Sequence, residues 1–192
     1  RRSKFGAETV KFSPVIDPTH LYFATASVVG HRKIFTDKVL AWIVLNSWRW
    51  LREHQRCLLF AFVVMPNHVH FVFQPIVPFD VHQVVASFTS FTAHQLLKTV
   101  EQRGDRDLLT YFAQQATDLK DRKHRIWNDP YVENVYSPAI LIQKVEYIHN
   151  NPLNKGWHLV EERADYWASS ACFYDRGIEP VIVVDDVRPL LD

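Results

Sequence analysis

The clearest signal in the chain is a set of short apolar runs. Residues 21–29, 57–64 and 68–74 are rich in β-branched and aromatic side chains, which is typical of β-strands. The run 57–64 is nearly continuous, so we expect it to be covered on both faces or to lie in the centre of a sheet. Only residues 65–67 (Met-Pro-Asn) separate the last two runs, and this short link predicts an antiparallel hairpin.

Three longer segments repeat apolar residues at intervals of three or four, which predicts helices with one face against a core. These helices span about residues 37–53, 80–99 and 138–150. Ser137 is a suitable N-cap for the third helix, and Pro152 disfavours helical geometry in the residue before it.

Weaker patterns complete the expected order of elements. Short helices are predicted over residues 108–115 and 165–173, and a terminal strand over 181–184. In the longer helices, Val39 and Phe91 are expected among the side chains that face the core.

The order of these elements predicts an α+β fold, with an antiparallel sheet and helices packed on it. The core resembles the split β-α-β arrangement of ferredoxin-like folds. A length of 192 residues suits one domain. We expect an N-terminal arm over residues 1–20, one folded domain over 21–175 and a C-terminal tail over 176–192.

Composition narrows the class of protein. An apolar fraction of 47%, with 14% aromatic residues, can fill a core and excludes global disorder. The formal charge of +1 says little about nucleic acid, so any basic surface must be local. Cys57 and Cys172 lack the spacing of a metal or disulfide motif, which suits a reducing cytosol. No apolar stretch is long enough to span a bilayer and no signal-peptide core is visible, so we expect a soluble cytoplasmic protein without a membrane partner.

A His-Val-His sequence opens the second strand of the predicted hairpin. Side chains alternate between the faces of a strand, so His68 and His70 point the same way while Val69 and Phe71 point the other. Two neighbouring imidazoles form half of a metal site. The pattern alone is equally compatible with two hydrogen-bonded core histidines.

The third predicted helix presents a second pair of polar groups. Leu141, Val145 and Ile148 are spaced to face the core, and Tyr147 and Asn151 lie one turn apart beside that face. A tyrosine hydroxyl and a carboxamide are thus presented together. Without further context, Tyr147 also fits a half-buried core tyrosine, and Asn151 fits a residue that stabilises the helix end.

These segments together resemble a known family. Residues 62–70 (FVVMPNHVH), followed far downstream by residues 147–152 (YIHNNP), are similar to the motifs of the REP-associated tyrosine transposases. That family belongs to the single-tyrosine transposases, whose hallmark is a His-hydrophobic-His pair. The resemblance covers about residues 21–173 and includes further landmarks at Trp127, Tyr131 and residues 165–170.

The resemblance implies a metal-dependent enzyme that cuts and joins DNA strands, with residues 21–175 as its catalytic domain. Tyr147 would attack the phosphorus and leave a 5′-phosphotyrosine link and a free 3′-hydroxyl, and a second strand end would reverse the link. His68 and His70 would hold a divalent ion, with Asn151 as the third ligand. A donor set without thiolate suits Mg²⁺ or Mn²⁺, and such an ion can polarise the phosphate oxygens.

Two other tyrosines compete for the role of nucleophile. Tyr131 and Tyr136 lie in an irregular or helix-leading segment, and neither has an amide four residues on, so both rank below Tyr147. His149 lies two residues from Tyr147 on the predicted helix. We therefore expect it to face away from Tyr147, at the surface or behind the site.

The implied partner is single-stranded or hairpin DNA of the repetitive extragenic palindrome (REP) type. Positive charges followed by an aromatic residue are the candidates for its binding: Lys120, Arg122, Lys123, Arg125 and Trp127. Asp118 and Asp121 support the alternative of a solvated charged loop equally well. Both a monomer and a homodimer remain open.

Two other functions also remain open. The chain could be a catalytically inactive DNA-binding module of the same fold, although intact His68, His70 and Tyr147 argue against this. It could instead be an unrelated metallohydrolase, although no H-E-x-x-H or similar acidic partner accompanies the histidines. Replacing Tyr147 by Phe separates that hydrolase from a tyrosine transposase, because a hydrolase using metal-bound water would stay active.

Overall fold

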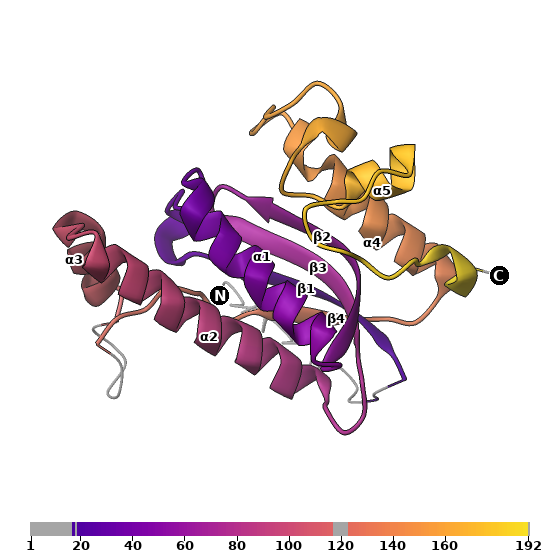
Figure 1. Ribbon diagram of the computed structural model, residues 1–192, viewed down its shortest axis with the longest axis horizontal. Helices are drawn as coiled ribbons and strands as arrows, with labels where there is room; N and C mark the ends of the chain where they lie inside the picture. The colour runs from indigo at the N-terminus through magenta and orange to yellow at the C-terminus, as the bar shows by residue number, and fades with distance from the viewer. Residues whose placement is uncertain (1–16, 18, 117–122, 192) are drawn as a thin grey trace, which may run out of the picture.

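A computed structural model of the protein describes residues 17, 19–116 and 123–191 (Figure 1). Four strands form one antiparallel sheet in the order β2-β3-β1-β4. The strands are β1 (Leu21–Ser27), β2 (Cys57–Met65), β3 (His68–Pro75) and β4 (Tyr131–Val135). The α-helices are α1 (Lys38–Glu53), α2 (Val81–Gln102), α3 (Arg106–Gln114), α4 (Pro138–Asn150) and α5 (Ala171–Arg176). Short 3₁₀ turns are η1 (Val29–His31), η2 (Asn151–Leu153), η3 (Arg163–Asp165) and η4 (Arg188–Leu190).

The order of the strands makes two interleaved split β-α-β units. α1 connects β1 to β2, and β3 fills the gap between these two strands. α2 and α3 connect β3 to β4, and β1 fills that second gap. This is the ferredoxin-like arrangement. The predicted α+β fold is confirmed.

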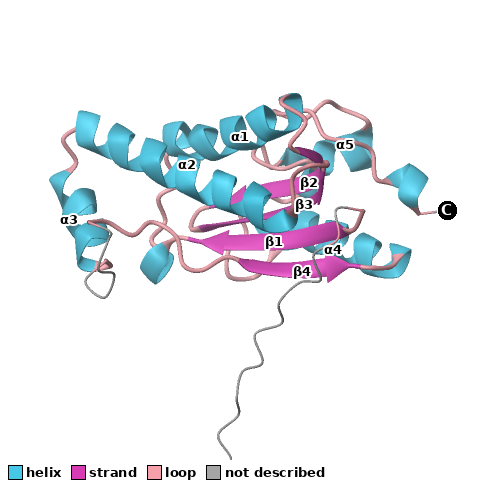
Figure 2. Ribbon diagram, turned by 90° about the horizontal axis from the view of Figure 1, so that it is seen from below, coloured by secondary structure: helices cyan, strands magenta, loops and turns pink. Residues whose placement is uncertain are grey.

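The sheet carries a helical layer on each face. α1 and α2 lie together along one face (Figure 2), where Trp48 of α1 stacks on Phe88 of α2 with ring centroids 5.4 Å apart. α4 covers the opposite face, where Val145 and Ile148 share a buried cluster with Val72 of β3. Burial on both sides explains the nearly continuous apolar run of β2. None of the described helices is long and apolar enough to cross a membrane.

Side-chain caps fix where the long helices begin. Asp37 and Ser137 accept hydrogen bonds from backbone amides in the first turns of α1 and α4. Asp80 does the same for α2, where it forms a reciprocal capping box with Gln83. Ser137 is thus the N-cap that the sequence predicts for α4.

Two helix side chains predicted to face the core are instead exposed. Val39 is 52% exposed and Phe91 is 49% exposed. The buried side chains next to them are Leu40 in α1 and Thr92 in α2. The predictions for Val39 and Phe91 were wrong because, at these two turns, the buried position is the next residue along the helix.

The second half of the chain departs more from the predicted elements. The sequence does not predict β4, because Glu133 and Asn134 interrupt what would be its apolar run. The helix expected over 108–115 is present as α3. The helix expected over 165–173 is replaced by η3 and the short α5.

The segment expected to be a tail lies against the sheet. Ile182 and Val184 are buried, and the backbone N–H of Asp185 donates to the Leu59 carbonyl of β2 at 2.7 Å. Arg52 of α1 binds the Asp185 carboxylate at 2.8 and 3.0 Å. Within the described residues, this segment forms no strand over 181–184, so that prediction was wrong.

Candidate active site

The two histidines of β3 lie side by side on the face of the sheet that α4 covers. Their ring centroids are 4.7 Å apart. Val69 and Phe71 point to the other face, into the cluster with α1 and α2. β3 lies between β1 and β2. The backbone that carries His68 and His70 is therefore hydrogen-bonded to a neighbouring strand on each side.

Each imidazole is oriented by a hydrogen bond at Nδ1. His68 Nδ1 donates to Asn67 Oδ1 at 2.6 Å, and the Asn67 amide is itself oriented because its Nδ2 donates to the His31 carbonyl at 3.1 Å. His70 Nδ1 contacts Thr25 Oγ1 of β1 at 2.7 Å. A histidine whose Nδ1 is held in this way can bind a metal ion through Nε2.

Burial keeps both histidines neutral near pH 7. Desolvation, with smaller contributions from His68 and Lys144, lowers the pKa of His70 to about 3. Desolvation also lowers the pKa of His68, and a hydrogen bond with the Asn151 side chain opposes that shift. A neutral imidazole has a free lone pair and is the form that binds a metal ion.

α4 brings the tyrosine and the amide to the same place. The Tyr147 ring lies edge-on to His70 with centroids 5.1 Å apart, and it contacts Phe23 of β1 at 5.9 Å. Tyr147 is 48% exposed, so a substrate can reach this residue. Asn151, at the start of η2, is buried beside His68. The structure therefore brings together His68, His70, Tyr147 and Asn151.

The donor atoms of this site fit a divalent cation. Among the described residues, His70 Nε2 is buried without a hydrogen-bond partner. With its Nδ1 proton committed to Asn67, neutral His68 has its lone pair at Nε2. Asn151 Nδ2 is also buried without a hydrogen-bond partner among the described residues. Two imidazole nitrogens and an amide oxygen could thus supply three ligands. No cluster of three His, Cys, Asp or Glu residues suited to a metal occurs in the part of the chain that the structure describes.

A shallow hollow of about 390 Å³ adjoins Tyr147 and contains two charged groups that the sequence did not single out. Lys144 Nζ lies 2.6 Å from Glu133 Oε2 and 4.6 Å from the centroid of the Phe23 ring. Lys144 is one turn before Tyr147 on α4, a spacing visible in the sequence. Glu133 could not be found in this way, because it lies on the unpredicted strand β4.

The competing tyrosines occupy different positions. Tyr131 lines the same hollow and donates a hydrogen bond from its hydroxyl to Glu133 Oε2 at 3.1 Å. Tyr136 is 75% exposed, in the link between β4 and α4. Tyr147 differs from both in its direct ring contact with His70.

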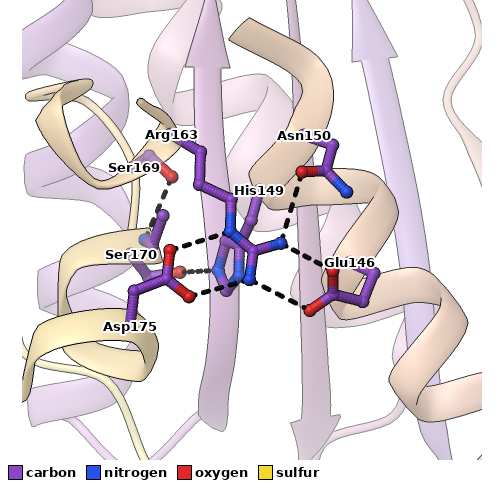
Figure 3. A network of polar contacts seen from close by, with 8 residues as sticks. Glu146, His149, Asn150, Arg163, Ser169, Ser170 and Asp175 are labelled. Atoms are coloured by element: carbon purple, nitrogen blue, oxygen red, sulfur yellow. Dashed lines mark hydrogen bonds and ion pairs between the residues drawn. The ribbon is translucent and has the colours of Figure 1, made fainter. Parts of the chain in front are cut away.

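His149 is fully buried and not at the surface. Its Nε2 lies 2.9 Å from Ser170 Oγ, on the side of α4 that faces the C-terminal segment. Figure 3 shows this contact beside Arg163, which binds Glu146 and Asn150 of α4 and Asp175 of α5. His149 follows Val145 by four residues, so helical spacing places it on the buried stripe of α4. Its partner Ser170 could not be found in this way, because it comes from a distant segment.

The residues proposed for DNA binding are only partly described. Lys120 and Arg122 lie outside the described residues, and Lys123 is exposed. Arg125 donates from Nε to the Trp127 carbonyl at 3.1 Å. Trp127 is buried and donates from its indole N–H to Thr92 Oγ1 at 3.0 Å, so its ring is part of the core and is not available to stack on a base.

Comparison with known proteins supports a transposase origin. Residues 19–110 match the family model of IS200-like transposases. A structure of a REP-associated tyrosine transposase bound to a REP hairpin is 18% identical, over 97% of this chain and 93% of that chain, with a TM-score of 0.58. This likeness shows a shared fold.

A protein from Deinococcus radiodurans R1, described as a candidate transposase, is 15% identical over 78% of this chain and 97% of that chain, with a TM-score of 0.42. None of the curated proteins compared with the chain matches it significantly. Residues 19–110, which include the histidine pair, thus match the model of the IS200-like transposases, in agreement with the resemblance seen in the sequence.

Proposed function

We propose that this protein cleaves and rejoins single-stranded or hairpin DNA through a covalent link to Tyr147. The observation that carries the proposal is the contact between the Tyr147 ring and His70, at a centroid distance of 5.1 Å. It joins a nucleophile on α4 to the histidine pair of the transposase segment. The family match ends before α4, so the assignment of Tyr147 and Asn151 depends on this geometry and on the sequence motif.

Tyr147 has the chemistry and the exposure for the first step. Its hydroxyl oxygen attacks the phosphorus, the new Oη–P bond forms, and the bond from phosphorus to the 3′ oxygen breaks. The tyrosine hydroxyl loses its proton, and the departing 3′ oxygen gains one. The 5′-phosphate is then held on Tyr147, and a 3′-hydroxyl from a second strand end reverses the step without an external energy source. Lys144, one turn away, is paired with Glu133 in the hollow where the phosphate would lie, and its ammonium would offset the charge on the phosphate by exchanging Glu133 for it.

His68, His70 and Asn151 are the residues that would hold the cofactor, Mg²⁺ or Mn²⁺. A bound ion of this kind would polarise the phosphate oxygens and offset the charge that develops on them. Hydrogen bonds with Asn67 and Thr25 fix the rings that would hold it. The set of two imidazoles and an amide leaves room for water and substrate oxygens, which suits these two ions.

The proposed substrate is a DNA hairpin with single-stranded flanks, of the REP type. Support comes from the shared fold with a transposase that was solved with a REP hairpin. The hollow at Tyr147 is open and shallow, which suits an extended strand better than a small metabolite.

The proposal is tested with a DNA hairpin taken from the sequence beside the gene and incubated with Mn²⁺ or Mg²⁺. The label is at the 3′ end, so that it stays with the fragment held on Tyr147. On a denaturing gel, we expect a protein–DNA adduct that disappears with EDTA and in Tyr147→Phe. Tyr136→Phe is the matched control, because it removes an exposed tyrosine hydroxyl near α4 that does not contact the histidines.

Two outcomes would contradict the proposal. Binding without an adduct, over both metals and several hairpins, would indicate an inactive DNA-binding module. Metal-dependent cleavage that persists in Tyr147→Phe would indicate a water nucleophile or another tyrosine.

A further inference from the structure

We propose that Trp157 and Lys33 form a platform that binds a single-stranded nucleotide beside the scissile phosphate. The inference rests on the proposed function for the position of that phosphate. The binding itself can be measured without cleavage. The platform also supplies an accessible aromatic residue for base stacking, which the buried Trp127 cannot do.

The platform adjoins the histidine pair on the side of His68. The Trp157 ring centroid lies 6.0 Å from that of His68. Trp157 is half-buried, with one part packed on the cluster beneath α4 and the rest accessible. The ammonium of Lys33, an exposed side chain, lies over the Trp157 ring at 5.1 Å from its centroid.

The loop that carries Lys33 is fixed to the turn that precedes His68. The backbone N–H groups of Val28 and Phe35 donate to the carbonyls of Asn67 and Pro66, both at 2.9 Å. The Asn67 side chain, which also orients His68, donates back into the same loop at the His31 carbonyl. The position of Lys33 is therefore tied to the position of the first histidine.

The loop that carries Trp157 is equally well fixed. The Asn154 carbonyl accepts hydrogen bonds from the Trp157 and His158 amides at 2.7 and 3.0 Å. The Leu159 amide donates to the Pro152 carbonyl at 2.9 Å, directly after Asn151. Trp157 is thus preorganised next to the candidate metal ligands, which lowers the entropic cost of binding.

The two groups match the two parts of a nucleotide. A base can stack on the Trp157 ring, and this contact tolerates any sequence because every base has a π-face. Among the described residues, Lys33 takes part in no salt bridge, so its ammonium is free to leave the ring for a phosphate. Exposed cation–π contacts are weak, so Lys33 loses little when it leaves the ring.

A second lysine–tryptophan pair offers a matched control. Lys38 Nζ lies 5.3 Å from the centroid of the Trp167 ring, and that ring contacts Trp42 of α1 at 6.1 Å. This pair has the same chemistry but belongs to the α1 side of the sheet, away from the histidines. If a lysine over a tryptophan were only a surface contact, both pairs would behave alike.

The test measures binding by fluorescence anisotropy, in EDTA and in the Tyr147→Phe background, so that no cleavage occurs. The probes are a fluorescein-labelled DNA hairpin with single-stranded flanks and the same hairpin with blunt ends. For the flanked hairpin, Trp157→Leu should weaken binding about tenfold or more. Lys33→Ala should weaken it and reduce the slope of log K against log salt by about 0.7. The blunt hairpin should not distinguish these variants, and Lys38→Ala and Trp167→Leu should bind both probes as the parent does.

The platform would be overturned if both Lys33→Ala and Trp157→Leu bound the flanked hairpin as tightly as the parent does. It would also be overturned if these variants lost as much affinity for the blunt hairpin as for the flanked one. Should Trp157→Leu fail to fold, Trp157→Phe keeps a stacking ring, and Lys33→Ala with its salt slope decides the question alone. The adduct assay with the wild type is independent of these outcomes, so the platform and the proposed chemistry can fail separately.

Discussion

His70 is the residue on which the candidate site depends most. It is 4% exposed, its Nδ1 is held by Thr25, and its Nε2 is buried without a partner among the described residues. A buried polar atom without a partner costs roughly 1–3 kcal/mol of stability. A cation at Nε2 would remove that cost, and the neutral state of the ring permits such binding.

Mn²⁺ should therefore stabilise the folded protein. At about 100 times its dissociation constant, a ligand of the folded state alone adds about 2.7 kcal/mol to the free energy of unfolding. We expect Mn²⁺ to raise the thermal midpoint of Tyr147→Phe, to leave that of His70→Ala unchanged and to raise that of Asn151→Ala by less. His158→Ala, which alters an exposed histidine, is the control and should respond fully. The same rise in His70→Ala would exclude this metal site.

α4 is the element that carries the nucleophile, and Arg163 holds it in place. Arg163 binds Glu146 at 2.6 and 3.2 Å and Asn150 at 3.3 Å, the residues directly before Tyr147 and Asn151. On its other side, Arg163 binds Asp175 of α5 at 2.7 and 2.8 Å. One guanidinium thus connects the helix of the site to the C-terminal segment.

Arg163→Gln should lower the free energy of unfolding by roughly 1–2 kcal/mol. This lies between the losses typical of breaking an exposed and a buried salt bridge. It should also slow adduct formation at a temperature where the variant is fully folded, because α4 loses its lateral support. Urea unfolding and the gel assay measure the two effects. Arg176→Gln is the matched control, since Arg176 also binds two carboxylates, Glu162 and Asp165, but does not contact α4. An equal loss of rate in Arg176→Gln would argue against a specific role for Arg163.

The same contact gives the protein an acid-sensitive stability. Hydrogen bonds from Arg163 lower the pKa of Asp175 from its usual value of 3.8. Because the unfolded chain then binds the proton more readily, the stabilisation is complete above pH 3.8 and is lost as pH falls through the lower folded-state pKa. Urea midpoints measured from pH 6 down to pH 3 should fall less steeply in Asp175→Asn than in the wild type. Parallel curves would mean that Asp175 does not contribute in this range.

The elements near the histidines could be predicted from the sequence because their signals are local. The period of two places His68 and His70 on one face, and the Met-Pro-Asn link allows only a hairpin. The surroundings could not be predicted, because they depend on segments far away in the chain. Trp127 is buried by its bond to Thr92, and Glu133 reaches the hollow through a strand without an apolar run. The partner of buried His149, Ser170, similarly comes from a distant segment.

In the molecule as a whole, one chain provides the complete candidate site. α4 packs on the same sheet that carries the histidines, and Ile148 is fully buried there. Tyr147 then reaches His70 of its own chain. A site shared between two subunits would require α4 to leave this face and to pack on the same face of a partner chain.

Mixing two inactive variants should therefore not restore activity. Tyr147→Phe lacks the nucleophile and His70→Ala lacks a metal ligand, and neither can repair the other if each site is built within one chain. The gel assay on the two proteins, alone and mixed at equal concentration after joint refolding, measures this. Recovery of adduct in the mixture would show that α4 serves the site of a partner subunit.

The central claim is that Tyr147 forms the covalent bond to DNA, and its most direct test is to identify the residue in the adduct. The adduct would be digested with nuclease and protease and sequenced by tandem mass spectrometry. We predict a peptide in which Tyr147 carries a 5′-linked nucleotide phosphate. A nucleotide on Tyr131, which lines the same hollow, or cleaved DNA with free 5′-phosphate ends and no linked peptide, would contradict the account.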